Sequence, residues 1–481
     1  MAYRDFQEFL TRLETEGELK RIQYPLDPHL EITEVADRMM KTDGPALLIE
    51  KPKGFDIPVA INTMGSRKRM SMALGVDDFE SIADEITELI KPEIPKGIIE
   101  KLRMVPKLRR LASLPPKTVK EGRCQEVVFE GKDVDLNRYP LLHCWPMDGG
   151  RYITLPLVFT HDPLTGKRNV GMYRIQQFDK CTAGMHWQMH KEGAEHYRLA
   201  EEKNRRIEVA VALGGDPAVI FSSIAPLPSG IDEMLFAGFL RHSPVEMVKC
   251  RTLNIEVPAD SEIVIEGYVD PLERRTEGPF GDHTGYYSLA DEYPVLHITA
   301  ITQRKKPVYP ATIVGIPPME DGWMGKAIER IFLPLIRLTL PEIVDMNLPI
   351  EGAFHNVALV SIKKRYPGHA FKIMNALWGL GQMMFTKYIF VFDADVNVQD
   401  ISECIWRMGA NTDPARDSLI VKGPCDVLDH ASDVMGFGGK LGLDCTHKLP
   451  SEGFPREWPP EIRMSSEVKN HIDSIWKELG I

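Results

Sequence analysis

The sequence predicts a mixed α/β protein with three domains and a separate C-terminal helix. Three observations lead to this fold class. The length of 481 residues exceeds what one ordinary core supports, the hydrophobic pattern changes twice along the chain, and a segment rich in Pro, Lys and Arg separates the first two patterns. We therefore expect domains at residues 1–118, 119–318 and 319–464, followed by a helix at residues 465–481.

The first pattern predicts an N-terminal α/β domain that opens with an amphipathic helix. Asp5 can cap this helix, and its apolar residues recur at helical spacing until Gly17: Phe6, Phe9, Leu10 and Leu13. Two more helices and two short buried strands are expected, the helices at 30–41 and 78–90 and the strands at 45–50 and 57–62. Residues 91–120 keep no sustained pattern and form the expected boundary.

The second pattern predicts a β-rich domain. Short stretches rich in β-branched residues are separated by Gly, Pro or Asp turns, which is typical of a barrel or a strongly bent antiparallel sheet. The expected strands are 153–162, 169–179, 207–215, 218–225, 262–270 and 295–315, interrupted by one helix at 230–242.

After Pro317 strands and helices alternate, which predicts a doubly wound α/β domain with a largely parallel sheet. The expected strands are 355–364, 387–396 and 418–423, and the expected helices are 368–380 and 398–408. Ser465 or Ser466 can cap the terminal helix, which carries a wide apolar stripe of Val468, Ile472, Ile475, Trp476 and Leu479.

Composition limits the function classes. The net charge is −11 and the basic residues form no long run, so nucleic acid is not an expected partner. No apolar run suits a membrane helix and the charged N-terminus is unlike a signal peptide, which favours a cytoplasmic protein without an integral membrane segment. The seven cysteines contain no C-x-x-C pair, so we expect reduced thiols.

The loop "EGPFGDHTGYY", residues 277–287, concentrates acids, a histidine, glycines and aromatics. Glu277 and Asp282 there indicate catalysis or a buried ion pair, although a polar turn with surface acids remains open. From another class, Asp393 and Asp395 in "FDADVN" are compatible with the metal site of a phosphoester hydrolase or with a surface turn.

A second group of polar residues can supply a mixed oxygen and nitrogen ligand set. Asn169, one of His186 and His190, and Glu246 would suit Mn²⁺ or Mg²⁺. Glu246 lies in an apolar strand, where a carboxylate is costly unless it is paired or bound to a metal. Three independently satisfied polar residues are the alternative.

The chain resembles the UbiD family of prenylated-FMN-dependent (de)carboxylases along essentially its whole length. The matching segments are "DFQEFLTRLETEGELKRI", "PHLEITEVADR", "GGRYIT", "NVGMYRIQ", "EMVKC", "EGPFGDHTGYY", "DADVN" and "GKLGLDCTHK". The resemblance implies an N-terminal α/β domain, a central split β-barrel that binds the flavin, and a C-terminal α/β domain that ends in a protruding helix.

The resemblance also implies the site residues. A divalent ion, Mn²⁺ or Mg²⁺, would join the flavin phosphate to Asn169, His190 and Glu246, with His186 as the alternative histidine. Further cofactor contacts, with a potassium ion near the two serines, fall on Met172, Tyr173, Arg174, Met189, Ser222 and Ser223. The implied catalytic set is Arg174, Glu277 and Asp282, and Asp at the third position favours a hydroxylated aromatic substrate.

The expected reaction is the decarboxylation of an aromatic acid such as 4-hydroxy-3-polyprenylbenzoate. Reversible (de)carboxylation of small phenolic or polycyclic acids, and cofactor binding without turnover, remain open. In this mechanism Asp282 donates the proton from a carboxyl whose pKa is raised by desolvation, and Arg174 keeps Glu277 ionised. The resemblance further implies a flavin prenyltransferase as cofactor supplier and a homodimer or homohexamer in which the terminal helix packs on a partner subunit.

Overall fold

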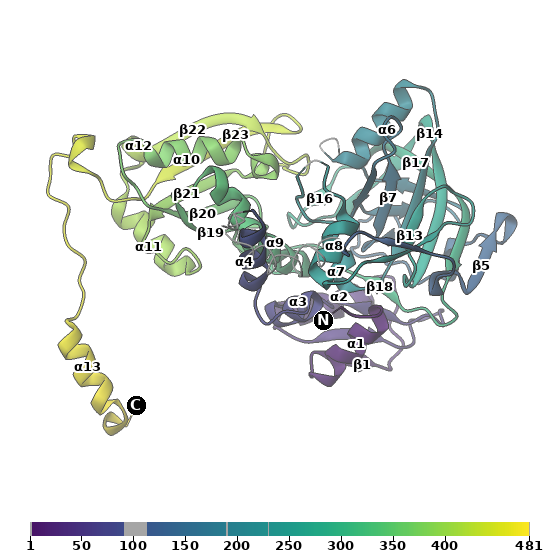
Figure 1. Ribbon diagram of the computed structural model, residues 1–481. Coiled ribbons are helices and arrows are strands. Elements are labelled where there is room, and N and C mark those ends of the chain that lie inside the picture. The colour runs from purple at the N-terminus through teal and green to yellow at the C-terminus, as the bar shows by residue number, and fades with distance from the viewer. Residues whose placement is uncertain (1, 91–112, 189–190, 229, 481) are drawn as a thin grey trace, which may run out of the picture.

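The computed structural model describes residues 2–90, 113–188, 191–228 and 230–480 (Figure 1). The N-terminal lobe lies below the central β-rich lobe, and the C-terminal α/β lobe lies beside both, with helix α9 between them (Figure 1). All seven cysteines are free, as expected for reduced thiols. Within the described residues, no helix combines the length and the apolar character that a bilayer span requires.

The N-terminal lobe is an α/β domain, as the sequence predicts. Its elements are α1 (Phe6–Thr15), β1 (Leu19–Ile22), α2 (Glu31–Lys41), β2 (Ala46–Ile49), β3 (Val59–Ile61), α3 (Arg67–Leu74) and α4 (Glu80–Ile90). Asp5 caps α1 by accepting a hydrogen bond of 2.9 Å from the Glu8 backbone N–H, and the apolar face of the helix is buried. The fourth strand of the sheet, β18 (Tyr309–Ala311), comes from far along the chain and pairs in parallel with β3.

The central lobe is built on a nine-stranded sheet with the order β6-β9-β10-β17-β14-β11-β7-β8 and with β5 paired to β17. Its strands are β5 (Val127–Glu130), β6 (Tyr152–Ile153), β7 (Leu157–His161), β8 (Arg168–Gly171), β9 (Ile175–Gln177), β10 (Thr182–Met185), β11 (Ile207–Leu213), β14 (Ile263–Glu277) and β17 (Asp291–Gln303). Among the described residues, β6 and β8 do not pair to close the sheet, so the split barrel remains a prediction.

Smaller elements complete this lobe. They are the sheet of β4 (Lys117–Val119), β12 (Glu246–Lys249) and β13 (Glu256–Pro258), the hairpin of β15 (Phe280–Gly281) and β16 (Tyr287–Ser288), and the helices α6 (Glu192–Glu202), α7 (Pro217–Ser222) and α8 (Glu233–Arg241).

The strand expected at residues 218–225 is wrong, because this stretch belongs largely to α7. Its run of apolar residues is buried on all sides, and such a run does not distinguish a strand from a helix. The helix is set by Asp216, whose side chain accepts a hydrogen bond of 2.8 Å from the Ala218 N–H, and by Pro217 in the first turn.

The C-terminal lobe carries a five-stranded sheet in the order β19-β20-β21-β23-β22. Its elements are α9 (Glu320–Thr339), β19 (Ile343–Asn347), β20 (Val357–Ile362), α10 (His369–Trp378), β21 (Tyr388–Asp393), α11 (Ile401–Asn411), α12 (Pro414–Asp417), β22 (Ser418–Pro424) and β23 (Phe437–Asp444). The three central strands are parallel, whereas β19 and β22 are antiparallel edges. Alternate β20 residues pack with α10 and α11 in separate clusters, so helices cover both faces, as predicted.

The chain ends in α13 (Ser466–Ile475), which projects away from the rest of the molecule (Figure 1). Ser465 caps it by accepting a hydrogen bond of 3.3 Å from the Val468 N–H. No residue of this helix is buried within one chain. Of the apolar stripe predicted from the sequence, Val468 and the following Trp476 and Leu479 are exposed, whereas Ile472 and Ile475 are half-buried.

Candidate active site

The loop at residues 277–287 brings two acids to one arginine. Arg174 lies between β8 and β9, Glu277 ends β14, and Asp282 follows β15. Gly278 has a φ of 90°, and a Cβ at this position would lie 3.3 Å from Leu289 O, so glycine is needed where the chain turns from β14 into β15. This turn lets both acids contact the Arg174 guanidinium, Glu277 at Nε and Nη2 and Asp282 at Nη1.

Arg174 forms a bidentate pair with Glu277, its Nε and Nη2 lying 2.9 Å from Oε1 and Oε2. Its Nη1 donates to Asp282 Oδ2, and Nη2 also donates to Ser288 Oγ at 3.0 Å. His186 Nδ1 lies 3.0 Å from Glu277 Oε2. The guanidinium carbon lies 4.7 Å from the centroid of the Phe280 ring, so the ion cluster has an aromatic wall.

Both carboxyl groups are held in the ionised state. Burial alone would raise the pKa of Glu277, but hydrogen bonds from His186 and Arg174 lower it below its usual value. Burial would also raise the pKa of Asp282, yet the hydrogen bond from His283 and the charge of Arg174 hold it well below the usual range. The prediction that burial raises the pKa of Asp282 is therefore wrong for the site without substrate. The sequence did not indicate that Arg174 and His283 both contact this carboxylate.

Asp148 anchors this loop and was missed in the sequence. Its Oδ1 accepts a hydrogen bond of 2.8 Å from the Gly281 N–H, and its Oδ2 accepts from the backbone of Cys144 and Trp145. Burial raises the pKa of Asp148 to about 6, although these hydrogen bonds act to lower it. The residue fixes β15 and so the position of Asp282.

The predicted metal ligands are only partly brought together. Asn169 is buried in β8 near Tyr173, and its Nδ2 makes no hydrogen bond of normal geometry with the described residues. His190 and Met189 lie outside the described residues. His186, the alternative histidine, uses Nδ1 toward Glu277, while its buried Nε2 has no partner among the described residues.

Glu246 does not meet the expectation of a buried carboxylate. It is exposed on β12, in a small sheet separate from the one that contains β8. The buried acid beside Asn169 is Glu233 at the start of α8, whose Oε2 accepts a hydrogen bond of 3.2 Å from the Val170 N–H. Burial raises the pKa of Glu233 to about 7, because no basic side chain forms a salt bridge with it in the described part of the chain.

The remaining predicted cofactor contacts lie around this region. Met172 and Tyr173 line the same cavity as Arg174, and the Tyr173 hydroxyl accepts from the Gly193 N–H at 3.4 Å. Ser222 and Ser223 are buried near the end of α7, where their hydroxyls donate to Ala218 O at 2.7 Å and Ile220 O at 2.8 Å.

A cavity of about 730 Å³ lies between the central and C-terminal lobes. Its polar wall contains Arg174, His186, Asp282 and His283. Its opposite wall is largely apolar and includes Ile328, Phe332, Leu335 and Ile336 of α9. This volume and composition are usual for a site that binds a small organic molecule.

The acids considered for a phosphoester hydrolase have other partners. Asp393 accepts hydrogen bonds from His447, from the backbone N–H at 2.8 Å and from Nδ1 at 2.9 Å. Asp395 pairs with Arg463 at 3.5 Å and Arg407 at 3.7 Å. These pairs favour a structural role for both acids.

Three family models match successive parts of the chain. They describe the N-terminal domain (residues 10–89), the Rift-related domain (117–317) and the C-terminal domain (322–445) of 3-octaprenyl-4-hydroxybenzoate carboxy-lyase, the UbiD family. A protein from Aquifex aeolicus is 55% identical over 482 residues and one from Archaeoglobus fulgidus 51% identical over 481. Both alignments span 100% of this chain and 99% of the relative, and both relatives are described only as uncharacterized proteins.

Solved structures agree with the family match. Vanillic acid decarboxylase of Sedimentibacter hydroxybenzoicus in its closed form has a TM-score of 0.87 at 28% identity, with 99% of this chain and 100% of that chain covered. The UbiD-class enzyme HmfF of Pelotomaculum thermopropionicum in complex with FMN has a TM-score of 0.79 at 30% identity, with coverage of 95% and 97%. The chain belongs to the UbiD family and is an enzyme of the carboxy-lyase class.

Proposed function

We propose that this protein is a prenylated-FMN-dependent decarboxylase of a hydroxylated aromatic acid. The observation that carries the proposal is the buried Arg174, Glu277 and Asp282 cluster on the wall of a largely apolar cavity. Clustered titratable groups with perturbed pKa values at such a wall are typical of active sites.

The residues near Asn169 fit a flavin phosphate held through a divalent ion. The buried Asn169 amide and Glu233 carboxylate offer two oxygen ligands, and the cost of burying Glu233 falls when a cation binds it. We therefore propose that Asn169 binds the ion, as expected, and that Glu233 replaces Glu246 as the carboxylate ligand. His190 stays a proposed third ligand, the ion stays Mn²⁺ or Mg²⁺, and a potassium ion near Ser222 and Ser223 stays a proposal.

When bound, prenylated FMN supplies an electron sink for the breaking carbon–carboxylate bond that no side chain offers. The chain orients the reactants and handles the proton. Arg174 fixes Glu277 as a carboxylate, and His186 holds the second oxygen of that group. The largely apolar lining of the cavity lowers the local polarity, which strengthens these interactions.

Asp282 can act as proton donor only after its environment changes, because it is ionised in the resting site. A substrate carboxylate that enters beside Arg174 competes with Asp282 for the guanidinium. The pKa of Asp282 then rises, since it keeps its burial and loses a compensating charge. Asp282 then takes up a proton from water and transfers it to the ring carbon after CO₂ leaves, which returns Asp282 to the carboxylate.

Two substrate classes have support. The TM-score of 0.87 with vanillic acid decarboxylase supports a small phenolic acid. The apolar α9 wall, with Phe332, Leu335 and Ile336, supports a ring that carries a prenyl chain, such as 4-hydroxy-3-polyprenylbenzoate.

The test is co-expression of the full chain with a flavin prenyltransferase, mass spectrometry of the bound cofactor, and CO₂ release from a panel of acids. The panel contains vanillate, 4-hydroxybenzoate, prenylated 4-hydroxybenzoates and benzoate. We expect prenylated FMN in the protein and turnover of at least one hydroxylated acid, with benzoate as the poorest substrate. Bound cofactor without CO₂ from any acid would instead identify a binding protein without turnover.

A further inference from the structure

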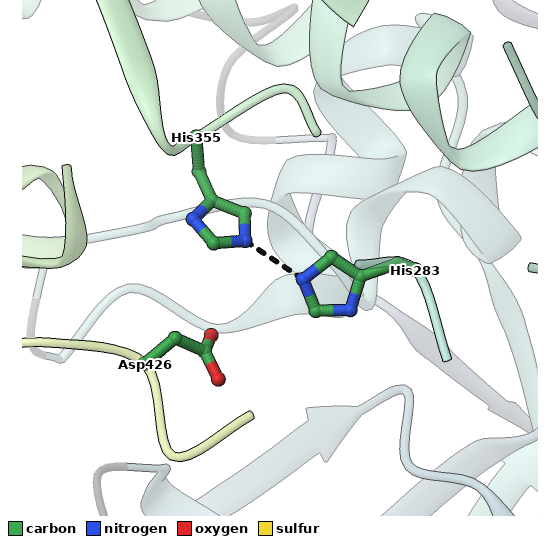
Figure 2. A group of neighbouring side chains, drawn as sticks. All are labelled: His283, His355 and Asp426. Atoms are coloured by element: carbon green, nitrogen blue, oxygen red, sulfur yellow. Dashed lines mark hydrogen bonds between the residues drawn. The ribbon is translucent and has the colours of Figure 1, made fainter. Parts of the chain in front are cut away.

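Two histidines and an aspartate meet where the central and C-terminal lobes face each other (Figure 2). His283 lies in the loop between β15 and β16, His355 precedes β20, and Asp426 follows β22. All three side chains are half-buried and line the cavity that also contains Arg174. The cluster shares no residue with the ligands proposed for the flavin phosphate.

The three side chains point toward one another (Figure 2). His283 Nε2 and His355 Nε2 are 2.7 Å apart, and a ligand atom of each of the three residues lies within 4.8 Å of the other two. Asp426 Oδ1 accepts a hydrogen bond of 2.8 Å from the Leu428 N–H, which orients the carboxylate. In the described part of the chain, no Lys or Arg lies within salt-bridge distance of Asp426; Lys191, whose charge acts on Asp426 from farther away, donates to Gln382 Oε1 at 3.5 Å.

His283 is oriented as metal-binding histidines usually are. Its Nδ1 lies 2.8 Å from Asp282 Oδ1, so an Nδ1–H can donate to this carboxylate while Nε2 faces His355. A carboxylate that fixes the ring and tautomer in this way commonly accompanies histidine ligands. The Phe354 ring, 5.5 Å from the His283 ring centroid, further limits its movement.

We propose that His283, His355 and Asp426 bind one divalent transition-metal ion, such as Zn²⁺ or Fe²⁺, and that this ion joins the catalytic loop to the C-terminal lobe. Two histidines and one carboxylate with open positions are a recurrent ligand set for these ions.

The geometry needs only a small adjustment. With metal–ligand distances of about 2.0 to 2.1 Å in tetrahedral geometry, two ligand nitrogens lie roughly 3.4 Å apart. The two Nε2 atoms must therefore separate from their 2.7 Å contact by less than about 1 Å. Rotation of the half-buried His355 side chain can supply this separation, while Asp282 and Phe354 hold the His283 ring.

A second group of similar composition is a poorer site and gives a matched control. Asp270, Glu273 and His297 also have ligand atoms within 4.8 Å of one another. There, however, Arg206 pairs with Asp270 at 2.5 Å and Arg275 with Glu273 at 3.7 Å. These arginines already compensate the two acids, so an added cation gains less at this place.

The ion at His283 would have open positions toward the cavity. The next consequence rests on the proposed decarboxylation. If that proposal is correct, a hydroxyl oxygen of the aromatic acid can occupy one of the open coordination positions. The ion would then select hydroxylated acids and hold the ring against Arg174. Its binding itself does not depend on the reaction.

The test measures zinc bound to the full-length, flavin-loaded protein after chelation and dialysis against Zn²⁺. His355→Ala and Asp426→Asn should each bind about one zinc equivalent fewer than the wild type. Glu273→Gln, in the control group, should bind as much zinc as the wild type. With the flavin-phosphate site refilled with manganese beforehand, X-ray absorption at the zinc edge of the wild type should show imidazole ligands, and this readout does not require a folded variant.

Equal zinc content in the wild type, His355→Ala and Asp426→Asn would overturn the site, as would a zinc edge without imidazole ligands. Because no substrate is present, this result is separate from the test of decarboxylation. A protein that binds zinc through these residues but releases no CO₂ would refute the proposed function alone.

Discussion

Two polar regions meet along β8 and the residues that follow it, and they differ in how their charges are compensated. In the Arg174 cluster, the guanidinium contacts Glu277, Asp282 and Ser288. Beside it, the Asn169 Nδ2 makes no hydrogen bond of normal geometry and Glu233 has no salt bridge among the described residues. The described residues compensate the charges of the first region, whereas we propose that a bound charged group completes the second.

The largest effect is expected for Arg174→Ala. This change leaves two buried carboxylates without their cation, and removing one partner of a buried pair costs about 3 to 5 kcal/mol. We expect loss of CO₂ release and a clear fall in the free energy of unfolding, measured by denaturant titration. In the control Arg275→Ala, an exposed arginine is removed, and the cost should be about 0 to 1 kcal/mol. If the two variants had similar stability, Arg174 would not be needed to compensate the buried charges of Glu277 and Asp282.

The next effect is expected for Asp282→Asn, which keeps the size of the side chain but removes the carboxylic proton. Turnover should fall by about 10² to 10⁴-fold with flavin content unchanged, because general acid catalysis contributes a factor of this order. Initial rates of CO₂ release and the flavin spectrum measure the two quantities. Asp291→Asn alters an exposed acid and should keep full activity. Near-normal turnover of Asp282→Asn would assign the proton to another group.

A third pair of variants tests the region around Asn169 and Glu233, where no basic side chain among the described residues pairs with the acid. Glu233→Gln should purify with little flavin and little manganese, because a neutral amide cannot balance the charge of an ion that bridges to phosphate. Glu246→Gln alters an exposed residue and should purify with normal cofactor content. Flavin absorbance and metal analysis measure both. Normal flavin and manganese content in Glu233→Gln, with loss of both in Glu246→Gln, would show that Glu246 and not Glu233 is the ligand.

The Arg174 cluster and the region around Asn169 also show which site residues could be predicted from the sequence and which could not. The composition of the loop at residues 277–287 indicated that Glu277 and Asp282 are catalytic or ion-paired, whereas Arg174 joined them only through the family resemblance. The carboxylate beside Asn169 was not predictable from local pattern. Glu246 has apolar neighbours and looked buried, yet its side chain is exposed on β12, while Glu233 looked like an ordinary acid in a first helical turn.

Long-range contacts account for other differences. The N-terminal sheet recruits β18 across more than half of the chain, which no periodicity indicates. His355 and Asp426 approach His283 from another lobe, so their spacing in the sequence gives no metal motif. By contrast, helices and strands with a strong local pattern were predicted. The apolar residues of α1 recur at helical spacing because one face is buried, and β20 is a continuous apolar run because both of its faces are buried.

The smallest effect on the catalytic residues is expected from removal of the C-terminal helix, because α13 makes no contact with the cavity. Within one chain, the 3-10 helix that follows α13 exposes 50% of Trp476 and 47% of Leu479. Burying the apolar stripe that these residues form with α13 is worth several kcal/mol at about 25 cal/mol per Å². We propose that a second copy of this chain covers it, so that truncation from Ser466 should convert a dimer or larger assembly into monomers or aggregates. Light scattering measures the change, and Trp476→Asp should act in the same direction while Lys469→Asp, at an exposed polar position of the helix, should not. A truncated protein that keeps the oligomeric size of the full chain would show that α13 does not hold the assembly together.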